Sequence, residues 1–205
     1  GMENLLREGV KGQRELVGNT MIDTFLRMLP YIEQESLPEY VKPPFVIATL
    51  HRPSNVDTKE ALANNLSFLG KVAEHCPVIL PLHHRTKSSL TTFGLTESIP
   101  AGVHIVDPLG YIPFLKLVKE SAFIITDSGG IQEEATLLKK RCFTLRKNTE
   151  RPSTIESGSN VLIDIQKDRD FDIVCKFAAD PNQVLKIKIP ALWDGETGKR
   201  IIYSI

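Results

Sequence analysis

The sequence AFIITDSGGIQEEA at residues 122–135 carries the clearest structural signal in the chain. A short β-branched run ends at Thr126, and a helical pattern begins near Ile131 after the turn DSGG at 127–130. A strand, a glycine turn and a helix in this order are typical of a βα unit. Glycines inside a helix cost about 1 kcal/mol each relative to alanine, so this pair favours close approach of the backbone to a ligand.

Similar apolar runs recur on both sides of this unit. They lie at residues 45–49, 78–81, 103–106, 142–145 and 161–163. Because the runs are continuous rather than alternating, they predict parallel strands that are covered on both faces. Residues 58–74 and 113–120 have apolar residues at helical spacing, with Asp57 or Thr58 as the N-cap of the first helix. The sequence therefore predicts an α/β fold with a doubly wound, Rossmann-like parallel sheet.

The length of 205 residues and an ordinary apolar content suit one globular domain. The 25 basic and 25 acidic residues cancel, and this balance disfavours nucleic-acid binding because phosphates attract an excess of positive charge. No apolar run approaches the roughly 20 residues of a membrane helix, and the N-terminus lacks the apolar stretch of a secretory signal. We expect no membrane partner, a cytoplasmic location, and three cysteines that are buried and reduced.

Ligands of doubly wound sheets bind beyond the carboxyl ends of the strands, so the loops there are the candidate sites. At the glycine turn, Ser128, Gly129 and Gly130 can hold a phosphate through backbone N–H groups and the helix dipole. Glu133 and Glu134 follow one turn later, where a carboxylate can accept hydrogen bonds from sugar hydroxyls. The alternatives are a plain N-cap with a glycine turn, and acids that only complement the helix dipole.

Two other strand ends carry histidine and arginine. In HRPSN at 51–55, His51 and Arg52 can contact an anion or exchange a proton, unless His51 only caps the next helix or is merely exposed. In HHR at 83–85, paired histidines suggest a metal, but no acid or cysteine lies at ligand spacing. We therefore expect no metal site.

A fourth strand end, LRKNTERP at 145–152, brings Arg146, Lys147 and Arg151 to the same edge of the sheet. Arg151 can bind a phosphate or a carboxylate in a bidentate manner. A solvated charged loop is the alternative. Taken together, the four loops indicate a pocket for a nucleotide sugar.

Four segments in their order along the chain resemble the non-hydrolysing UDP-N-acetylglucosamine 2-epimerases. They are TLHRPSNVD at 49–57, DPLGYIPFLKLV at 107–118, TDSGGIQEEA at 126–135 and LRKNTERP at 145–152. The likeness runs from VGNTMID at residue 17 to WDGETGKRI near the end of the chain. It implies the C-terminal, nucleotide-binding half of a two-domain, glycogen-phosphorylase-like (GT-B) architecture.

The resemblance also implies roles for individual residues. Residues Ser128, Gly129 and Gly130 would hold the diphosphate, and Glu134 would bind the ribose hydroxyls. Phe114 would stack on uracil, Arg151 would lie near the phosphates, and His51 would act as a catalytic residue close to the sugar. Further substrate-binding positions are Arg52, Asn55 and His83.

The reaction of this family interconverts UDP-GlcNAc and UDP-ManNAc. UDP is eliminated to leave a 2-acetamidoglucal and then adds again with C2 inverted. The resemblance thus implies UDP and the two UDP-sugars as ligands, with no cofactor and no metal.

The principal catalytic carboxylates of the family lie in an N-terminal domain that precedes the VGNT segment. We therefore expect residues 1–42 to be a helix and linker belonging to that domain, and residues 43–205 to be the UDP-binding domain with a C-terminal tail helix. A Gly1-Met2 start is typical of a cloned segment. The chain alone should lack competent catalysis, and the full-length protein should be a homodimer.

Other functions fit the same motifs. The donor-binding domain of a GT-B glycosyltransferase shares the architecture and the glycine-plus-glutamate recognition of nucleotides. A non-catalytic module that binds UDP-sugars is a second alternative. A hydrolysing epimerase is a third, which HRPSNVD at 51–57 disfavours.

Overall fold

A computed structural model of the chain describes residues 2–204 and contains one parallel sheet. Its strands are Val46–Thr49 (β1), Val78–Pro81 (β2), Val103–Val106 (β3), Phe123–Thr126 (β4), Cys142–Thr144 (β5) and Asn160–Leu162 (β6). Their order across the sheet is β3-β2-β1-β4-β5-β6, and every neighbouring pair is parallel. The predicted doubly wound, Rossmann-like sheet is confirmed, with each strand within one residue of its expected start.

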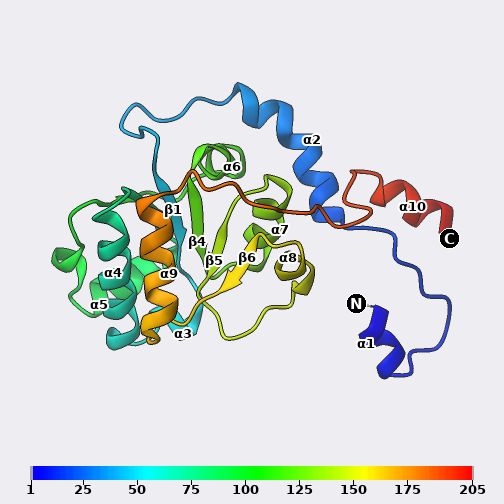
Figure 1. The fold of residues 1–205 in the computed structure, drawn as a ribbon, viewed down its shortest axis with the longest axis horizontal. Coiled ribbons are helices and arrows are strands. Elements are labelled where there is room, and N and C mark those ends of the chain that lie inside the picture. Colours follow the sequence, from blue (N-terminus) through cyan, green and yellow to red (C-terminus); the bar gives the residue numbers. More distant parts are fainter. Residues whose placement is uncertain (1, 205) are drawn as a thin grey trace.

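Helices cover both faces of the sheet (Figure 1). They are Met2–Arg7 (α1), Thr20–Gln34 (α2), Pro53–Val56 (α3), Lys59–Ala73 (α4), His84–Thr92 (α5), Thr96–Ser98 (η1, a 3-10 turn), Tyr111–Glu120 (α6), Gly129–Leu137 (α7), Pro152–Glu156 (α8), Asp168–Ala179 (α9) and Thr197–Ser204 (α10). Helices α4, α5 and α9 pack on one face, whereas α2, α6 and α7 pack on the other. Helix α1 and the coil after it extend away from the body of the molecule (Figure 1).

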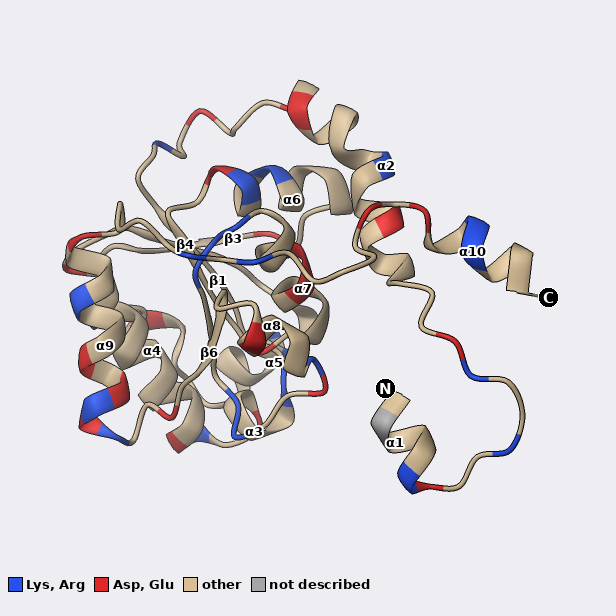
Figure 2. Cartoon of the chain, turned by 45° about the vertical axis from the view of Figure 1, so that its right-hand side comes forward, with Lys and Arg blue, Asp and Glu red and all other residues tan. Residues whose placement is uncertain are grey.

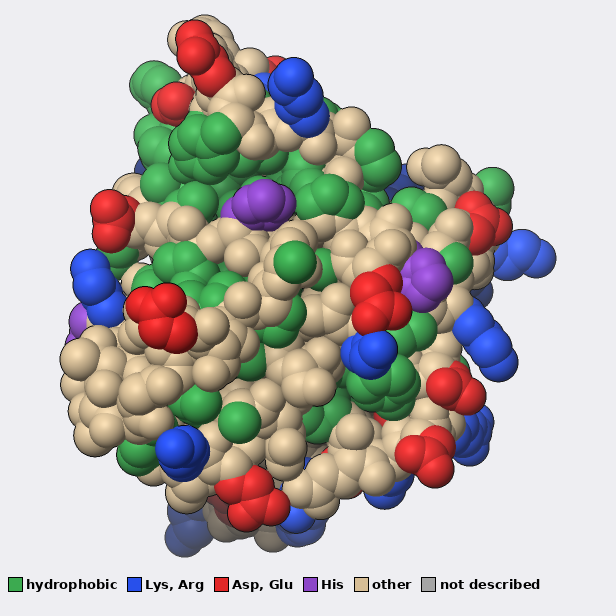
Figure 3. Space-filling model, turned by 90° about the vertical axis from the view of Figure 1, so that its left-hand side faces the viewer, with side chains coloured by type: hydrophobic (Ala, Val, Ile, Leu, Met, Phe, Trp, Pro, Cys, Tyr) green, Lys and Arg blue, Asp and Glu red, His purple; other side chains and the backbone are tan. Residues whose placement is uncertain are grey.

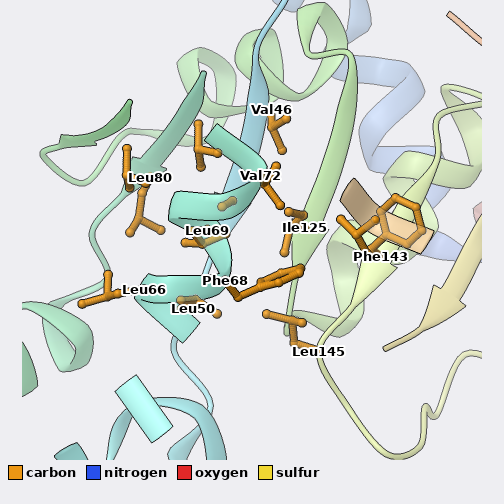
Figure 4. Close-up of a cluster of buried hydrophobic side chains, with 14 of the residues drawn as sticks. Val46, Leu50, Leu66, Phe68, Leu69, Val72, Leu80, Ile125, Phe143 and Leu145 are labelled. Atoms are coloured by element: carbon orange, nitrogen blue, oxygen red, sulfur yellow. The ribbon is translucent and has the colours of Figure 1, made fainter. Parts of the chain in front are cut away.

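The continuous apolar runs are explained by burial on both faces of the sheet. In β1, Val46 and Ala48 join the cluster beneath α4 and α9, whereas Ile47 joins the cluster beneath α2 and α6. Figure 4 shows how Phe68 and Leu69 of α4 lie against the strands in the first cluster. Fully burying side chains of this size stabilises the fold by about 2 kcal/mol each.

Helix α4 forms where the sequence pattern predicted it. The hydroxyl of Thr58 caps the helix by accepting a hydrogen bond from the backbone N–H of Ala61 at 3.2 Å. The apolar face at Leu62, Leu66 and Leu69 is buried. The N-cap sets the start of the helix, and the apolar side chains set the face that packs on the sheet.

The strand order reverses between β1 and β4, and this topology creates the crevice where ligands of such sheets bind. The chain visits β2 and β3 on one side of β1 and then crosses to β4 on the other. The hydroxyls of Thr49 and Thr126, at the ends of β1 and β4, lie 2.6 Å apart. The loops that follow these two threonines therefore meet at the switch point.

Helix α2, placed by the sequence in an N-terminal segment of residues 1–42, shares the core of the sheet domain. Phe25 and Ile32 are buried in the same cluster as α6. Asp23 accepts hydrogen bonds from the backbone N–H groups of Thr197 (3.2 Å) and Gly198 (2.8 Å), so it caps α10. The two terminal regions thus meet beside α7, and a division at residue 42 stays a prediction.

The cysteines only partly match the expectation. Cys76 and Cys142 are buried, but Cys175 on α9 is half-buried. The buried stripe of α9 contains Val174 and Phe177, and Cys175 lies at its edge. All three are free thiols.

Within residues 2–204 no helix combines the length and apolar character needed to cross a bilayer. Figure 3 shows acidic and basic side chains interspersed over the face at the left of Figure 1. This mixing agrees with a formal net charge of zero.

Candidate functional site

A cavity of about 190 Å³ opens at the carboxyl ends of the central strands. Its lining comes from the ends of β1 and β2, the loops after β1 to β4 and the first turns of α6 and α7: Thr49, Leu50, His51, Pro81, Leu82, His83, Pro108, Leu109, Phe114, Ser128 and Ile131. Four residues predicted from sequence, His51, His83, Phe114 and Ser128, thus line one space. An aromatic ring, two imidazoles and a helix N-terminus suit a ligand with a flat ring and an anionic group.

A larger cavity of about 500 Å³ lies beside it, toward β5 and β6. Arg52 and Asn55, also predicted as substrate-binding residues, line this second space together with Arg146 and Lys147. The loop after β1 therefore separates the two cavities, with His51 on one side and Arg52 on the other. The predicted substrate-binding set does not line a single pocket.

Asp127 ties the loop after β1 to the end of β4. Its Oδ1 lies 2.7 Å from Nδ1 of His51. Its Oδ2 accepts hydrogen bonds from the backbone N–H groups of His51 (2.9 Å) and Arg52 (2.8 Å) and from Nδ2 of Asn55 (3.0 Å). Burial by itself would raise the pKa of Asp127, but the hydrogen bonds from His51 and Arg52 outweigh it and lower the pKa.

Sequence reasoning did not single out Asp127 as a site residue, although it directly follows a predicted strand. Its partners are more than 70 positions away in the chain, so only the strand order shows the contact. Nδ2 of Asn55 also donates to the carbonyl oxygen of Leu145 at 3.1 Å. Both amide hydrogens of Asn55 are therefore engaged in holding the loop.

The glycine turn begins helix α7 directly at Gly129, two residues before the predicted start. Ser128 is the N-cap residue, but its side chain makes no capping hydrogen bond. A Cβ on Gly129 would lie 2.8 Å from Oε1 of Glu150, so this exposed, flexible carboxylate would have to shift to admit a side chain. The group that approaches Gly129 in the structure is Glu150, and the close approach of a ligand to this glycine stays a prediction.

Glu150 forms ion pairs with two arginines at this edge of the sheet. It pairs with Nη2 of Arg52 at 3.3 Å and with Nη2 of Arg146 at 2.6 Å. Its pKa is lowered to about 2, chiefly by the hydrogen bond from Arg146. An incoming anion would therefore compete with Glu150 for these guanidinium groups.

Glu134 is buried in α7, with an exposed fraction of 4%. The hydroxyl of Tyr111 donates a hydrogen bond to its Oε1 at 3.1 Å. Burial raises the pKa of Glu134 to about 7, against the opposing effect of this hydrogen bond. Figure 2 shows the acidic residues of α7 as a red band near α8.

Glu133 links the residues before α2 to the loop at residues 145–152. Its Oε1 accepts a hydrogen bond from Nδ2 of Asn19 at 2.8 Å and lies 3.1 Å from Nε of Arg151. Burial raises the pKa of Glu133, although Arg151 and Asn19 oppose the shift. Arg151 therefore pairs with a carboxylate of α7, and its place near the phosphates of a ligand stays a prediction.

Among residues 2–204 no group of three or more histidine, cysteine or acidic side chains is arranged to hold a metal ion. His83 instead caps α5, because its Nδ1 accepts a hydrogen bond from the backbone N–H of Arg85 at 3.3 Å. Burial and the neighbouring His84 and His51 lower the pKa of His83. An imidazole in this setting favours its neutral form.

Several known proteins that match this chain are UDP-N-acetylglucosamine 2-epimerases. Residues 1–205 match a family model described as UDP-N-acetylglucosamine 2-epimerase. The UDP-N-acetylglucosamine 2-epimerase of Methanocaldococcus jannaschii is 37% identical over 210 residues, which cover 97% of this chain and 56% of that protein. The protein of the same name from Methanococcus maripaludis is 33% identical, with coverage of 97% and 56%.

Solved structures give the same result. The crystal structure of the M. jannaschii enzyme in complex with UDP-GlcNAc and UDP has a TM-score of 0.84 at 35% identity, covering 100% of this chain and 59% of that chain. The Neisseria meningitidis enzyme bound to UDP-GlcNAc has a TM-score of 0.79 at 25% identity, with coverage of 98% and 58%. This chain therefore spans somewhat more than half the length of these relatives.

Proposed function

The chain belongs to the UDP-N-acetylglucosamine 2-epimerase family, and from this premise we propose that it supplies the nucleotide-binding half of an enzyme that interconverts UDP-GlcNAc and UDP-ManNAc. The reaction eliminates UDP to give a 2-acetamidoglucal and then adds UDP back with C2 inverted. UDP and the two UDP-sugars are the proposed ligands.

One observation carries this proposal. His51 and Ser128, from the loops after β1 and β4, and Phe114, from the first turn of α6, line one cavity at the topological switch point. In the proposed complex Phe114 stacks on uracil, the N-terminus of α7 at residues 128–130 holds the diphosphate, and His51 lies beside the sugar. His83 lines the same cavity and contacts the ligand from the loop after β2.

Glu134 and Arg151 complete the proposed nucleotide site. The carboxylate of Glu134 accepts hydrogen bonds from the ribose hydroxyls, which replace or supplement the hydrogen bond from Tyr111. Arg151 exchanges Glu133 for a phosphate oxygen, a partner with more negative charge. Arg52 and Asn55 remain proposed binding residues, reached from the larger cavity.

The remaining half of the catalytic machinery is proposed to come from a second domain in a GT-B arrangement. Groups that act on the sugar must approach it from both sides of a cleft, and positioning across a cleft supplies much of the rate. The isolated chain is therefore proposed to bind UDP without competent catalysis. The full-length protein is proposed to be a cytoplasmic homodimer.

Titration calorimetry with UDP tests the site. Glu134→Ala and Arg151→Ala should each weaken UDP binding by about tenfold or more, because each removes a charged hydrogen-bonding group. The exposed residues Glu60 and Arg169 provide matched control variants, Glu60→Ala and Arg169→Ala, with unchanged affinity. Equal affinities for UDP in all four variants would contradict a UDP site at this edge of the sheet.

The reaction is tested with UDP-GlcNAc alone, followed by NMR of the anomeric protons. The isolated chain should leave the sugar unchanged, whereas a full-length protein should produce UDP-ManNAc without any acceptor. Enzyme-like conversion by the isolated chain would contradict the proposal that a second domain supplies part of the catalytic groups. Inertness of the full-length protein without an acceptor would favour a glycosyltransferase instead.

A further inference from the structure

Asp127 stands out among the acidic groups at the carboxyl edge of the sheet. Its side chain has an exposed fraction of 0%, and it accepts from three donors through Oδ2 alone. Within residues 2–204, Oδ1 has no other hydrogen-bond partner, and Nδ1 of His51 lies 2.7 Å from it, too close for a nitrogen and an oxygen atom without a proton between them. Both oxygens of this carboxylate therefore face the loop after β1.

The charge on Asp127 fixes the direction of the bond to His51. Its hydrogen bonds lower the pKa of Asp127 despite burial, so the group is a carboxylate at neutral pH and can only accept. Nδ1 of His51 must therefore carry a proton. In the neutral imidazole the other nitrogen, Nε2, is then the acceptor.

The cavity supplies the second part of the geometry. The side chain of His51 is 33% exposed and lines the space that also contains Phe114 and Ser128. The ring of His83 lies beside this side chain, with its centroid 5.2 Å from that of His51. Because Nδ1 is occupied by Asp127, Nε2 is the ring nitrogen left for a ligand.

We infer that Asp127 is a positioning residue, which holds His51 in the Nδ1–H tautomer and presents an unprotonated Nε2 to the ligand. Its catalytic meaning rests on the proposed function, in which His51 lies beside the sugar. The tautomer itself does not depend on that function, because it follows from contacts within the chain.

A role limited to loop structure is the competing explanation, because Asp127 also accepts backbone N–H groups. Asp127→Asn separates the two roles. The amide oxygen can keep the three donors of Oδ2, while the amide N–H₂ faces Nδ1 of His51 and donates to it. The loop is then retained, but the proton of the imidazole moves to Nε2.

Two-bond ¹⁵N–¹H correlation NMR of the ligand-free chain, in alkaline buffer, reads the tautomer directly. His51→Gln identifies the signals of His51. The wild-type chain should show a protonated Nδ1 and an unprotonated Nε2, and Asp127→Asn should show the reverse. Asp57→Asn is the matched control, because Asp57 pairs with Arg85 at the surface and should leave the tautomer unchanged.

The wild-type spectrum alone can overturn the inference, even where Asp127→Asn fails to fold. A protonated Nε2 in the wild-type chain would contradict it. A folded Asp127→Asn variant that keeps the proton on Nδ1 would reduce Asp127 to a structural role. Since no ligand is present, failure of UDP binding leaves this result untouched, and the two proposals fail separately.

In a catalytically active full-length protein, Asp127→Asn should lower kcat by at least about tenfold with little change in KM. A purely structural defect would change both parameters. Equal kcat in the two proteins would show that the tautomer is dispensable for the reaction.

Discussion

Two buried carboxyl groups in the same strand–helix unit, Asp127 and Glu134, behave in opposite ways. Their exposed fractions are 0% and 4%. The pKa of Asp127 is nevertheless lowered, whereas that of Glu134 is raised to about 7. Burial therefore does not decide the charge state at this site.

The number of available donors explains the difference. Asp127 lies just beyond the end of a strand, where the backbone N–H groups of the adjacent loop are free to donate to it. Glu134 lies within α7, where backbone N–H groups are already used by the helix, and Tyr111 is its one side-chain donor among residues 2–204. Asp127 thus organises the loop, whereas Glu134 is short of donors that ribose hydroxyls could supply.

Removing the carboxylate of Asp127, which has the larger number of donors, should have the largest effect on stability. Asp127→Ala leaves several buried donors without a partner and should lower the free energy of unfolding by about 3–5 kcal/mol. Urea denaturation followed by circular dichroism measures this change. Asp57→Ala, which removes a surface partner of Arg85, should change it by less than about 1 kcal/mol. A loss for Asp127→Ala as small as that of the control would show that its donors find other acceptors.

Neutralising Glu134, which has fewer donors, should instead raise the free energy of unfolding. A carboxyl whose pKa is raised from 4.5 to about 7 on folding destabilises the ionised folded state by up to about 3 kcal/mol. This cost is absent below pH 4.5 and is complete above pH 7. Glu134→Gln should therefore stabilise the fold in alkaline buffer by up to that amount, and have little effect in acid. Denaturation at both pH values checks the sign, and equal effects at the two would contradict a raised pKa.

The pH dependence of UDP binding should show the smallest of the three effects. If ribose hydroxyls donate to ionised Glu134, affinity should rise about tenfold between one unit below and one unit above its pKa, or about 1.4 kcal/mol. Calorimetry at several pH values measures this rise. Glu134→Gln controls for the titration of the phosphate, and superimposable profiles of the two proteins would contradict the role of Glu134.

Much of the fold followed from local patterns. The strand at residues 123–126 and the helix capped by Thr58 were predicted because apolar periodicity and capping depend on neighbours in the chain. The glycine turn was also recognised locally. Its helix begins two residues earlier than expected, since Gly129 is already helical.

The candidate site was only partly predictable. His51 and Ser128 each follow a strand, and the predicted topology brings their loops to one edge, whereas Phe114 lies in α6 and was expected at the site only from the family resemblance. That Arg52 and Asn55 line a different cavity could not be predicted, because one residue along a loop can reverse the direction of a side chain. The half-buried position of Cys175 was also missed, because consecutive residues of a helix point in different directions and Val174, not Cys175, faces the core.

The order of the main strands and helices and the residue types at each strand end could be predicted from local patterns, because these depend on hydrophobic spacing over a few residues. Which of those residues meet depends on the folded arrangement of the chain. Asp127 and His51 are separated by 76 positions, and Tyr111 and Glu134 by 23. Their contacts, and hence their charge states, arise because the chain crosses the sheet between β3 and β4 and places β4 beside β1.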